Sequence, residues 1–264
     1  MLLTRVLTAA ALLAAFAAAL FLLERTGFAL VVAAIVVAGA FEWARLCKVT
    51  GLWAWIYAAV GGGIYWSLVD LRLADSVVAG ASIFWLVVAP YWLARGFRPA
   101  PEPWRLMVGY VVLVPAGLVM TSLPAKLLTM VLGLVWSADI GAYLVGVVLG
   151  RHKLAPSISP GKTWEGVAGG AVFCLAYAII WTVFDVQLRA QVERVAWAPF
   201  LAGILFLCGL SVLGDLFESA LKRDTGAKDS GHLLPGHGGV LDRIDSATAT
   251  LPAALLLLRA MGAA

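Results

Sequence analysis

Long apolar segments, joined by short polar connections, run through almost the whole chain and restrict it to a membrane fold. A helix needs about 20 mostly apolar residues to cross a bilayer. By this rule the sequence predicts about nine transmembrane helices and no soluble domain. The predicted spans cover residues 2–23, 28–46, 52–69, 76–93, 104–121, 125–149, 163–184, 198–221 and 242–261.

The composition agrees with this interpretation. The chain of 264 residues is 62% hydrophobic and 13% charged, whereas soluble domains are about 45–50% apolar and about 25% charged. We therefore expect an all-α, polytopic bundle of membrane helices. The net charge of +4 suits basic loops and anionic lipid better than it suits nucleic acid, so no nucleic-acid partner is expected.

The longest polar run of the chain covers residues 219–246 and mixes acidic, basic and glycine residues. Carboxylates can hold a hard divalent cation, and Lys and Arg can neutralise phosphate oxygens. Successive glycines let backbone N–H groups approach an anion. Together these residue types predict metal-assisted phosphoryl or nucleotidyl transfer. The alternative from composition alone is a charged loop between two spans.

Two stripes of polar residues flank this run. Helical spacing places Ser211, Asp215 and Lys222 on one face of the span that precedes it. Asp242 and Asp245 begin the span that follows it. Two carboxylates that meet repel each other unless a cation lies between them, so we expect Asp215 and Asp242 to share a magnesium ion.

Ionisable residues also interrupt two other apolar segments. Asp139 shares a helix face with Tyr143 and Gly146, either bonded to a neighbouring helix or lining a substrate cavity. Glu42 and Arg45 lie one helical turn apart, and we expect them to form a local ion pair with a structural role.

Residues 150–166 form a polar connection in which hydroxyl and ammonium groups can meet phosphate oxygens. These groups belong to Ser157, Ser159, Lys162 and Thr163. Thr163 is also placed to cap the following helix, with Glu165 near the positive end of the helix dipole.

The run 219–246 resembles the signature of the phosphatidate cytidylyltransferases, the CDP-diacylglycerol synthases. The family pattern has Ser, then Lys-Arg, Lys-Asp, Pro-Gly-His-Gly-Gly and Asp-Arg-x-Asp; here these elements stand at residues 219, 222–223, 228–229, 235–239 and 242–245. Residues 158–166 resemble a second block, Ile-Ser-Pro-x-Lys-Thr-x-Glu-Gly. A pattern with this many fixed positions is far more specific than a lone glycine motif. The likeness reaches upstream to about residue 136 and continues more weakly over the N-terminal half.

The resemblance implies that the protein is a membrane nucleotidyltransferase of phospholipid synthesis, which transfers CMP from CTP to phosphatidate and releases pyrophosphate. The residues assigned to catalysis are Asp215, Asp242, Lys222, Arg223 and His237. The residues assigned to Mg²⁺ are Asp215, Asp242, Asp139 and Asp245. The residues assigned to the nucleotide phosphates are Ser159, Lys162, Lys228, Gly236, Gly238 and Gly239. A second cation is left open.

Two other functions remain as alternatives. A CTP-dependent kinase of a lipid alcohol would release CDP and would need a base for a neutral hydroxyl. A transporter would also carry polar residues inside its spans, but no inverted repeat is visible. The motif Asp-Gly-x-x-Ala-Arg of the CDP-alcohol phosphatidyltransferases does not occur in the chain.

The organisation follows from these assignments. Residues 1–100 are interpreted as N-terminal transmembrane helices and residues 101–264 as the catalytic region. The distribution of Lys and Arg favours the cytoplasmic side for the run 219–246. The expected location is the inner membrane of a bacterium. Small residues on several spans would permit a homodimer, and they would equally suit packing within one chain.

Overall fold

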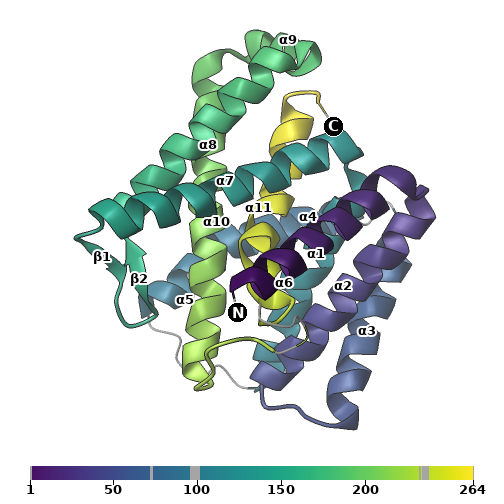
Figure 1. The fold of residues 1–264 in the computed structure, drawn as a ribbon. Coiled ribbons are helices and arrows are strands. Elements are labelled where there is room, and N and C mark those ends of the chain that lie inside the picture. Colours follow the sequence, from purple (N-terminus) through teal and green to yellow (C-terminus); the bar gives the residue numbers. More distant parts are fainter. Residues whose placement is uncertain (1, 72–73, 96–101, 232, 234–237, 264) are drawn as a thin grey trace.

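The computed structural model describes residues 2–71, 74–95, 102–231, 233 and 238–263. These residues form helices and one small two-stranded sheet (Figure 1). The helices are α1 (Leu2–Leu22), α2 (Arg25–Leu46), α3 (Leu52–Leu68), α4 (Ala74–Ile83), α5 (Ala89–Arg95), α6 (Glu102–Ser122), α7 (Ala125–Leu149), α8 (Trp164–Phe184), α9 (Val186–Val195), α10 (Trp197–Asp224) and α11 (Leu241–Ala260). This architecture confirms the predicted all-α membrane fold.

Each predicted span coincides with helical structure, and span 76–93 is α4 and α5 joined by a π-helical turn, Phe84–Val88. Among the described residues, six helical stretches are long and apolar enough to cross a membrane. They are Arg25–Leu46, Asp75–Arg95, Pro103–Ser122, Ala125–Leu149, Trp164–Phe184 and Trp197–Asp224. The predicted count of nine is therefore not confirmed. Helix α3 has only 17 residues, and α11 begins with charged residues that lower its hydropathy.

Helices α7 and α8 form an antiparallel pair that packs through glycines. A Cβ added at Gly169 would come within 2.8 Å of the carbonyl oxygen of Gly141. A Cβ at Gly170 would come equally close to the carbonyl oxygen of Ala138. The two backbones approach each other closely because these side chains are missing, as is common between membrane helices.

The connection between α7 and α8 folds into a β-hairpin, where the sequence predicted only a loop. Strand β1 (Lys153–Ala155) pairs antiparallel with β2 (Ser159–Thr163), with Lys153 opposite Thr163. The prediction that Thr163 caps the next helix is confirmed, because its Oγ1 accepts the N–H of Gly166 at 3.1 Å. The cap fixes the hairpin to the first turn of α8.

Helices α10 and α11 cross at Gly214. A Cβ at this position would lie 2.5 Å from the carbonyl oxygen of Asp245, so only glycine permits this approach. The crossing brings the turn of α10 that carries Asp215 next to the turn of α11 that carries Asp245. The fold thus joins the two polar stripes that flank the run 219–246.

The N-terminal helices pack against the C-terminal ones. Trp43 of α2 donates its indole N–H to the carbonyl of Arg105 in α6 at 2.8 Å. Arg105 also pairs with Asp224, at the end of α10, at 2.8 Å. Phe84 contacts the Phe217 ring of α10 edge to face. The boundary predicted at residue 100 lies outside the described residues, and the division into two regions stays a prediction.

Candidate functional site

A polar cavity of about 490 Å³ lies between α7, the β-hairpin, α8 and α10. The polar residues among those that line it are Asp139, Tyr143, Ser159, Lys162, Thr163 and Asp215. The predicted face of α7 does line this cavity. The second sequence block, residues 158–166, closes it from the hairpin side. Residues far apart along the chain therefore share one polar space at the ends of apolar helices.

The first charged pair of the site joins the hairpin to α10. The ammonium group of Lys162 lies 2.6 Å from Oδ2 of Asp215. The other oxygen of Asp215 accepts the hydroxyl of Ser219 at 3.2 Å, one turn along α10. Lys162 and Asp215 are 22% and 31% exposed, so solvent and ligands can still reach both groups.

The second charged pair lies further along α10. The ammonium group of Lys222 is 2.7 Å from Oδ1 of Asp242. Asp242 also accepts the backbone N–H and the hydroxyl of Ser230, both at 3.0 Å, and the N–H of Gly239 at 2.8 Å. Gly238 has a φ of +80°, a left-handed conformation that glycine adopts without strain. The glycine run thus lets the chain fold around this carboxylate.

The structure brings the predicted carboxylates together in part. The charges of Asp139, Asp215 and Asp245 are close enough to act on one another. Asp242 instead faces Lys222 and the loop after α10, and no described contact joins it to Asp215. In the described part of the chain, no three His, Cys, Asp or Glu side chains converge on one point suited to a metal ion.

Several buried oxygen atoms around this junction receive no hydrogen bond from the described residues. They are the hydroxyls of Ser211 and Ser246 and both carboxylate oxygens of Glu218. One oxygen of Glu218 lies 3.3 Å from the Lys222 ammonium, which is an ion pair without hydrogen-bond geometry. Oxygen atoms that lack hydrogen bonds and lie beside several carboxylates are the type of ligand that a hard cation such as Mg²⁺ takes. The ligand set itself stays a prediction.

The remaining predicted residues surround the cavity or lie outside the described chain. Arg223 donates from Nε to the carbonyl of Ile158 at 3.2 Å and so ties α10 to the hairpin. Arg223 and Lys228 are exposed, and no described acidic group pairs with either. His237 and Gly236 fall outside the described residues, so their predicted roles are untested.

One carboxylate near the site was misjudged from the sequence. The predicted ion pair between Glu42 and Arg45 does not form; the Arg45 guanidinium lies 5.9 Å from the Phe41 ring centroid. Glu42 instead accepts the N–H of Leu241 at 2.9 Å and the hydroxyl of Ser230 at 3.0 Å. The sequence did contain one indication of these contacts. A carboxylate inside an apolar segment is costly to bury unless polar groups bind it, so Glu42 was expected to have such partners.

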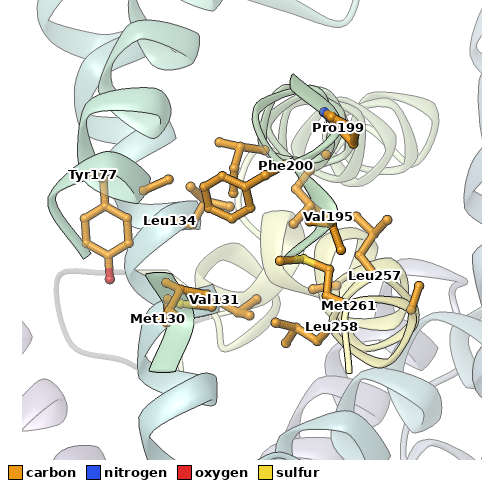
Figure 2. Close-up of a pocket in the computed structure, with 17 residues that line it drawn as sticks. Met130, Val131, Leu134, Tyr177, Val195, Pro199, Phe200, Leu257, Leu258 and Met261 are labelled. Carbon is orange, nitrogen blue, oxygen red and sulfur yellow. The ribbon is translucent and has the colours of Figure 1, made fainter. Parts of the chain in front are cut away.

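A second cavity, of about 250 Å³, lies at the opposite ends of α7, α8, α10 and α11 (Figure 2). Figure 2 shows Leu134, Phe200 and Met261 among the apolar side chains that surround it. None of the described residues that line it is charged. A triphosphate has no counter-charge there, so the polar cavity is the candidate active site.

Comparisons with known proteins agree with this site. A model of the cytidylyltransferase family matches residues 3–261. A phosphatidate cytidylyltransferase of Pseudomonas aeruginosa is 41% identical over 99% of this chain and 98% of its own length. One of Haemophilus influenzae is 35% identical over 96% of both chains. One of Bacillus subtilis is 52% identical over 47% of this chain and 44% of its own length. The chain belongs to the cytidylyltransferase family.

Proposed function

We propose that this protein transfers CMP from CTP to phosphatidate and forms CDP-diacylglycerol and pyrophosphate. The observation that carries the proposal is the pair Lys162–Asp215 at a polar cavity in a bundle of apolar helices, with the second pair, Lys222–Asp242, further along α10. Because the nucleotide is dissolved in water and the lipid lies in the membrane, the two substrates must react at the membrane–water interface. The family and the names of the relatives support the same reaction.

The reaction is a displacement at phosphorus. A phosphate oxygen of the lipid attacks the α-phosphorus of CTP and forms a new P–O bond. The bond from that phosphorus to the oxygen bridging to the β-phosphate breaks, and pyrophosphate leaves with the electron pair. A phosphomonoester has a second pKa of about 6, so the nucleophile is already ionised near neutral pH and needs no strong general base. The main obstacle is repulsion between anions.

The basic residues are proposed to reduce this repulsion. Lys162 and Lys222 reach the site from the hairpin and from α10, and each already faces a carboxylate. Arg223 and Lys228 supply exposed cations for the outer phosphates. The N–H groups of Gly236 and Gly238 and the side chain of His237 are proposed to hold phosphate oxygens, as glycine-rich loops do, whereas the N–H of Gly239 already binds Asp242.

The carboxylates are proposed to hold Mg²⁺. Asp215 and Asp242 remain the first candidates, and Asp139 and Asp245 are further ligands or partners of ligands. When bound, Mg²⁺ neutralises phosphate charge and aligns the reacting groups. Asp139 and Asp215 line the cavity directly, and the unsatisfied oxygens of Ser246 and Glu218 lie at the α10–α11 contact. Whether one cation or two bind is left to metal titration.

We also propose that the site faces the cytoplasm, where CTP is found, from a bacterial inner membrane. The bacterial relatives and the basic loops support this placement. A homodimer is a further proposal, and light scattering of the detergent-solubilised protein tests it.

Identification of the reaction product distinguishes the proposed transferase from the two alternatives. Purified protein in mixed micelles is given phosphatidate, Mg²⁺ and CTP labelled at the α-phosphate. We expect label in CDP-diacylglycerol and one pyrophosphate released for each lipid product. A lipid kinase would instead leave the label in CDP and none of it in the lipid. Substrate counterflow in liposomes without nucleotide turnover would identify a transporter.

A further inference from the structure

Glu42 lies in an apolar helix of the N-terminal half but contacts the signature run directly. Its side chain is buried, with the residue 1% exposed. One carboxylate oxygen accepts the N–H of Val240 at 3.0 Å. The other accepts the N–H of Leu241 at 2.9 Å and the hydroxyl of Ser230 at 3.0 Å. Ser230 lies in the connection that follows α10, whereas Val240 and Leu241 lie at the start of α11.

Ser230 connects this carboxylate to a predicted metal ligand. Its Oγ lies 3.0 Å from Oε2 of Glu42 and 3.0 Å from Oδ2 of Asp242. A hydroxyl carries one proton, so it donates to one carboxylate at a time. The backbone N–H of Ser230 also binds Asp242. A displacement of Glu42 would therefore move Ser230 and, through it, change the position of Asp242.

The glycines of the connection between α10 and α11 fit around Glu42. A Cβ at Gly231 would lie 2.5 Å from Oε1 of Glu42. A Cβ at Gly239 would overlap Oε2 of Glu42 and Oγ of Ser230. Two glycines of the signature run are thus required by the close approach of this carboxylate, and not only by a ligand.

Figure 1 shows the chain that follows α10 passing beside the C-terminal end of α2. The Glu42 carboxylate also lies at the first turn of α11, where free N–H groups and the helix dipole stabilise an anion. It therefore joins α2 to Ser230 and to the start of α11.

We propose that Glu42 is a positioning residue for the transferase reaction. It ties Ser230, Val240 and Leu241 to α2 and so fixes Asp242 beside Lys222. This inference rests on the proposed function, because the reaction and the role of Asp242 in cation binding come from it. It adds a residue outside both sequence blocks to the machinery of the site.

The test compares Glu42→Gln and Ser230→Ala with the wild-type protein. An amide at position 42 has only one acceptor oxygen, so in either orientation its NH2 group faces the N–H of Val240 or the donors of Leu241 and Ser230. The contact is weakened with little change of volume. We expect the Mg²⁺ concentration for half-maximal activity to rise about 10–100-fold, as for other partners of metal ligands. The KM for phosphatidate should stay unchanged.

The matched control is Glu24→Gln, since Glu24 is exposed at the start of the same helix and makes no side-chain cap. It should leave the Mg²⁺ dependence unchanged. The effects of Glu42→Gln and Ser230→Ala should add only in part in the double variant, because both act on the hydrogen bond between Ser230 and Glu42. If Glu42→Gln does not fold, Glu42→Asp, which keeps the charge on a shorter side chain, takes its place.

Hydrogen exchange gives a readout without activity. The amides of Val240 and Leu241 should exchange faster in Glu42→Gln than in wild type. Unchanged exchange, or a lower melting temperature with normal Mg²⁺ dependence, would overturn the proposal. If wild type makes no CDP-diacylglycerol, the proposed function fails, whereas the exchange result still shows whether Glu42 holds the start of α11.

Discussion

Each basic residue at the centre of the site faces an acidic one, and this pairing has a cost. The pairs Lys162–Asp215 and Lys222–Asp242 are partly buried, and such pairs contribute little net stability because desolvation opposes the attraction. The main effect of these pairs is to position the charged groups. They hold the cations and carboxylates in place before any phosphate arrives, so little reorganisation is needed during the proposed reaction.

Replacing Lys162 with Gln should lower kcat/KM for CTP strongly. The amide keeps much of the side-chain length but loses the charge opposite the phosphates, and loss of one such donor costs about 10²–10³-fold. Steady-state kinetics of the purified variant measure the effect. Lys153→Gln, in the exposed partner strand of the hairpin, is the control and should keep near wild-type activity. Equal losses in both variants would point to a damaged hairpin instead.

Asp215→Asn and Asp242→Asn should each reduce CDP-diacylglycerol formation by about 10²-fold or more, because a neutral amide binds a divalent cation poorly. Excess Mg²⁺ should restore part of the activity. The control Asp70→Asn removes an exposed pair with Arg25, worth about 1 kcal/mol at most. Full activity in either site variant would remove that aspartate from the proposed metal site.

At the scale of elements, the apolar segments predicted the helices well and the connections poorly. Helix α7 has the same bounds as its predicted span, because apolar length alone defines a membrane helix. The hairpin was missed because its Ser-Pro-Gly run is typical of a loop; its pairing depends on contacts such as Trp164 N–H to the carbonyl of His152 at 2.9 Å. Helix α9 was missed because it is short and amphipathic.

The stability of the junction between α8 and α9 should depend on pH, because an aspartate caps α9 there. Asp185 caps α9 through the N–H groups of Gln187 and Leu188, both at 3.1 Å. Its ion pair with Lys126, at 2.5 Å, holds the pKa of Asp185 below its ordinary value, against the opposite effect of burial. A lowered pKa stabilises the fold above the unfolded pKa of about 4, and the contribution disappears as the pH falls through the folded value.

We therefore expect Asp185→Ala, which removes cap and charge, to cost about 0.5–2 kcal/mol at neutral pH. Asp185→Asn keeps a capping oxygen and should cost less. Thermal melting in detergent measures both. The difference between wild type and the Asn variant should shrink as the pH falls below about 4; a constant difference would show that the charge contributes nothing.

At the scale of the whole molecule, the sequence defined the parts of the site but not how they meet. Helical spacing placed Asp139 and Asp215 on polar faces, and the structure brings both to one cavity. The sequence could not show that Asp242 faces Lys222 and the loop after α10. Nor could it reveal that Glu42 contacts Ser230, 188 positions later. Periodicity says which residues share a face, whereas contacts between faces depend on packing of the entire bundle.

The orientation of the bundle gives a prediction for the intact membrane. Helices α7, α8 and α10 are candidate spans, so the site and α9 must lie on opposite sides if these helices cross the bilayer. The three native cysteines are buried, which leaves a low background for thiol labelling. Lys228→Cys, beside the site, and Glu193→Cys, on α9, are both at exposed positions. A membrane-impermeant maleimide should label the first variant only in inverted vesicles and the second only in intact spheroplasts. Reversed labelling would place the site outside, where CTP is absent, and would contradict the proposed reaction in the cell.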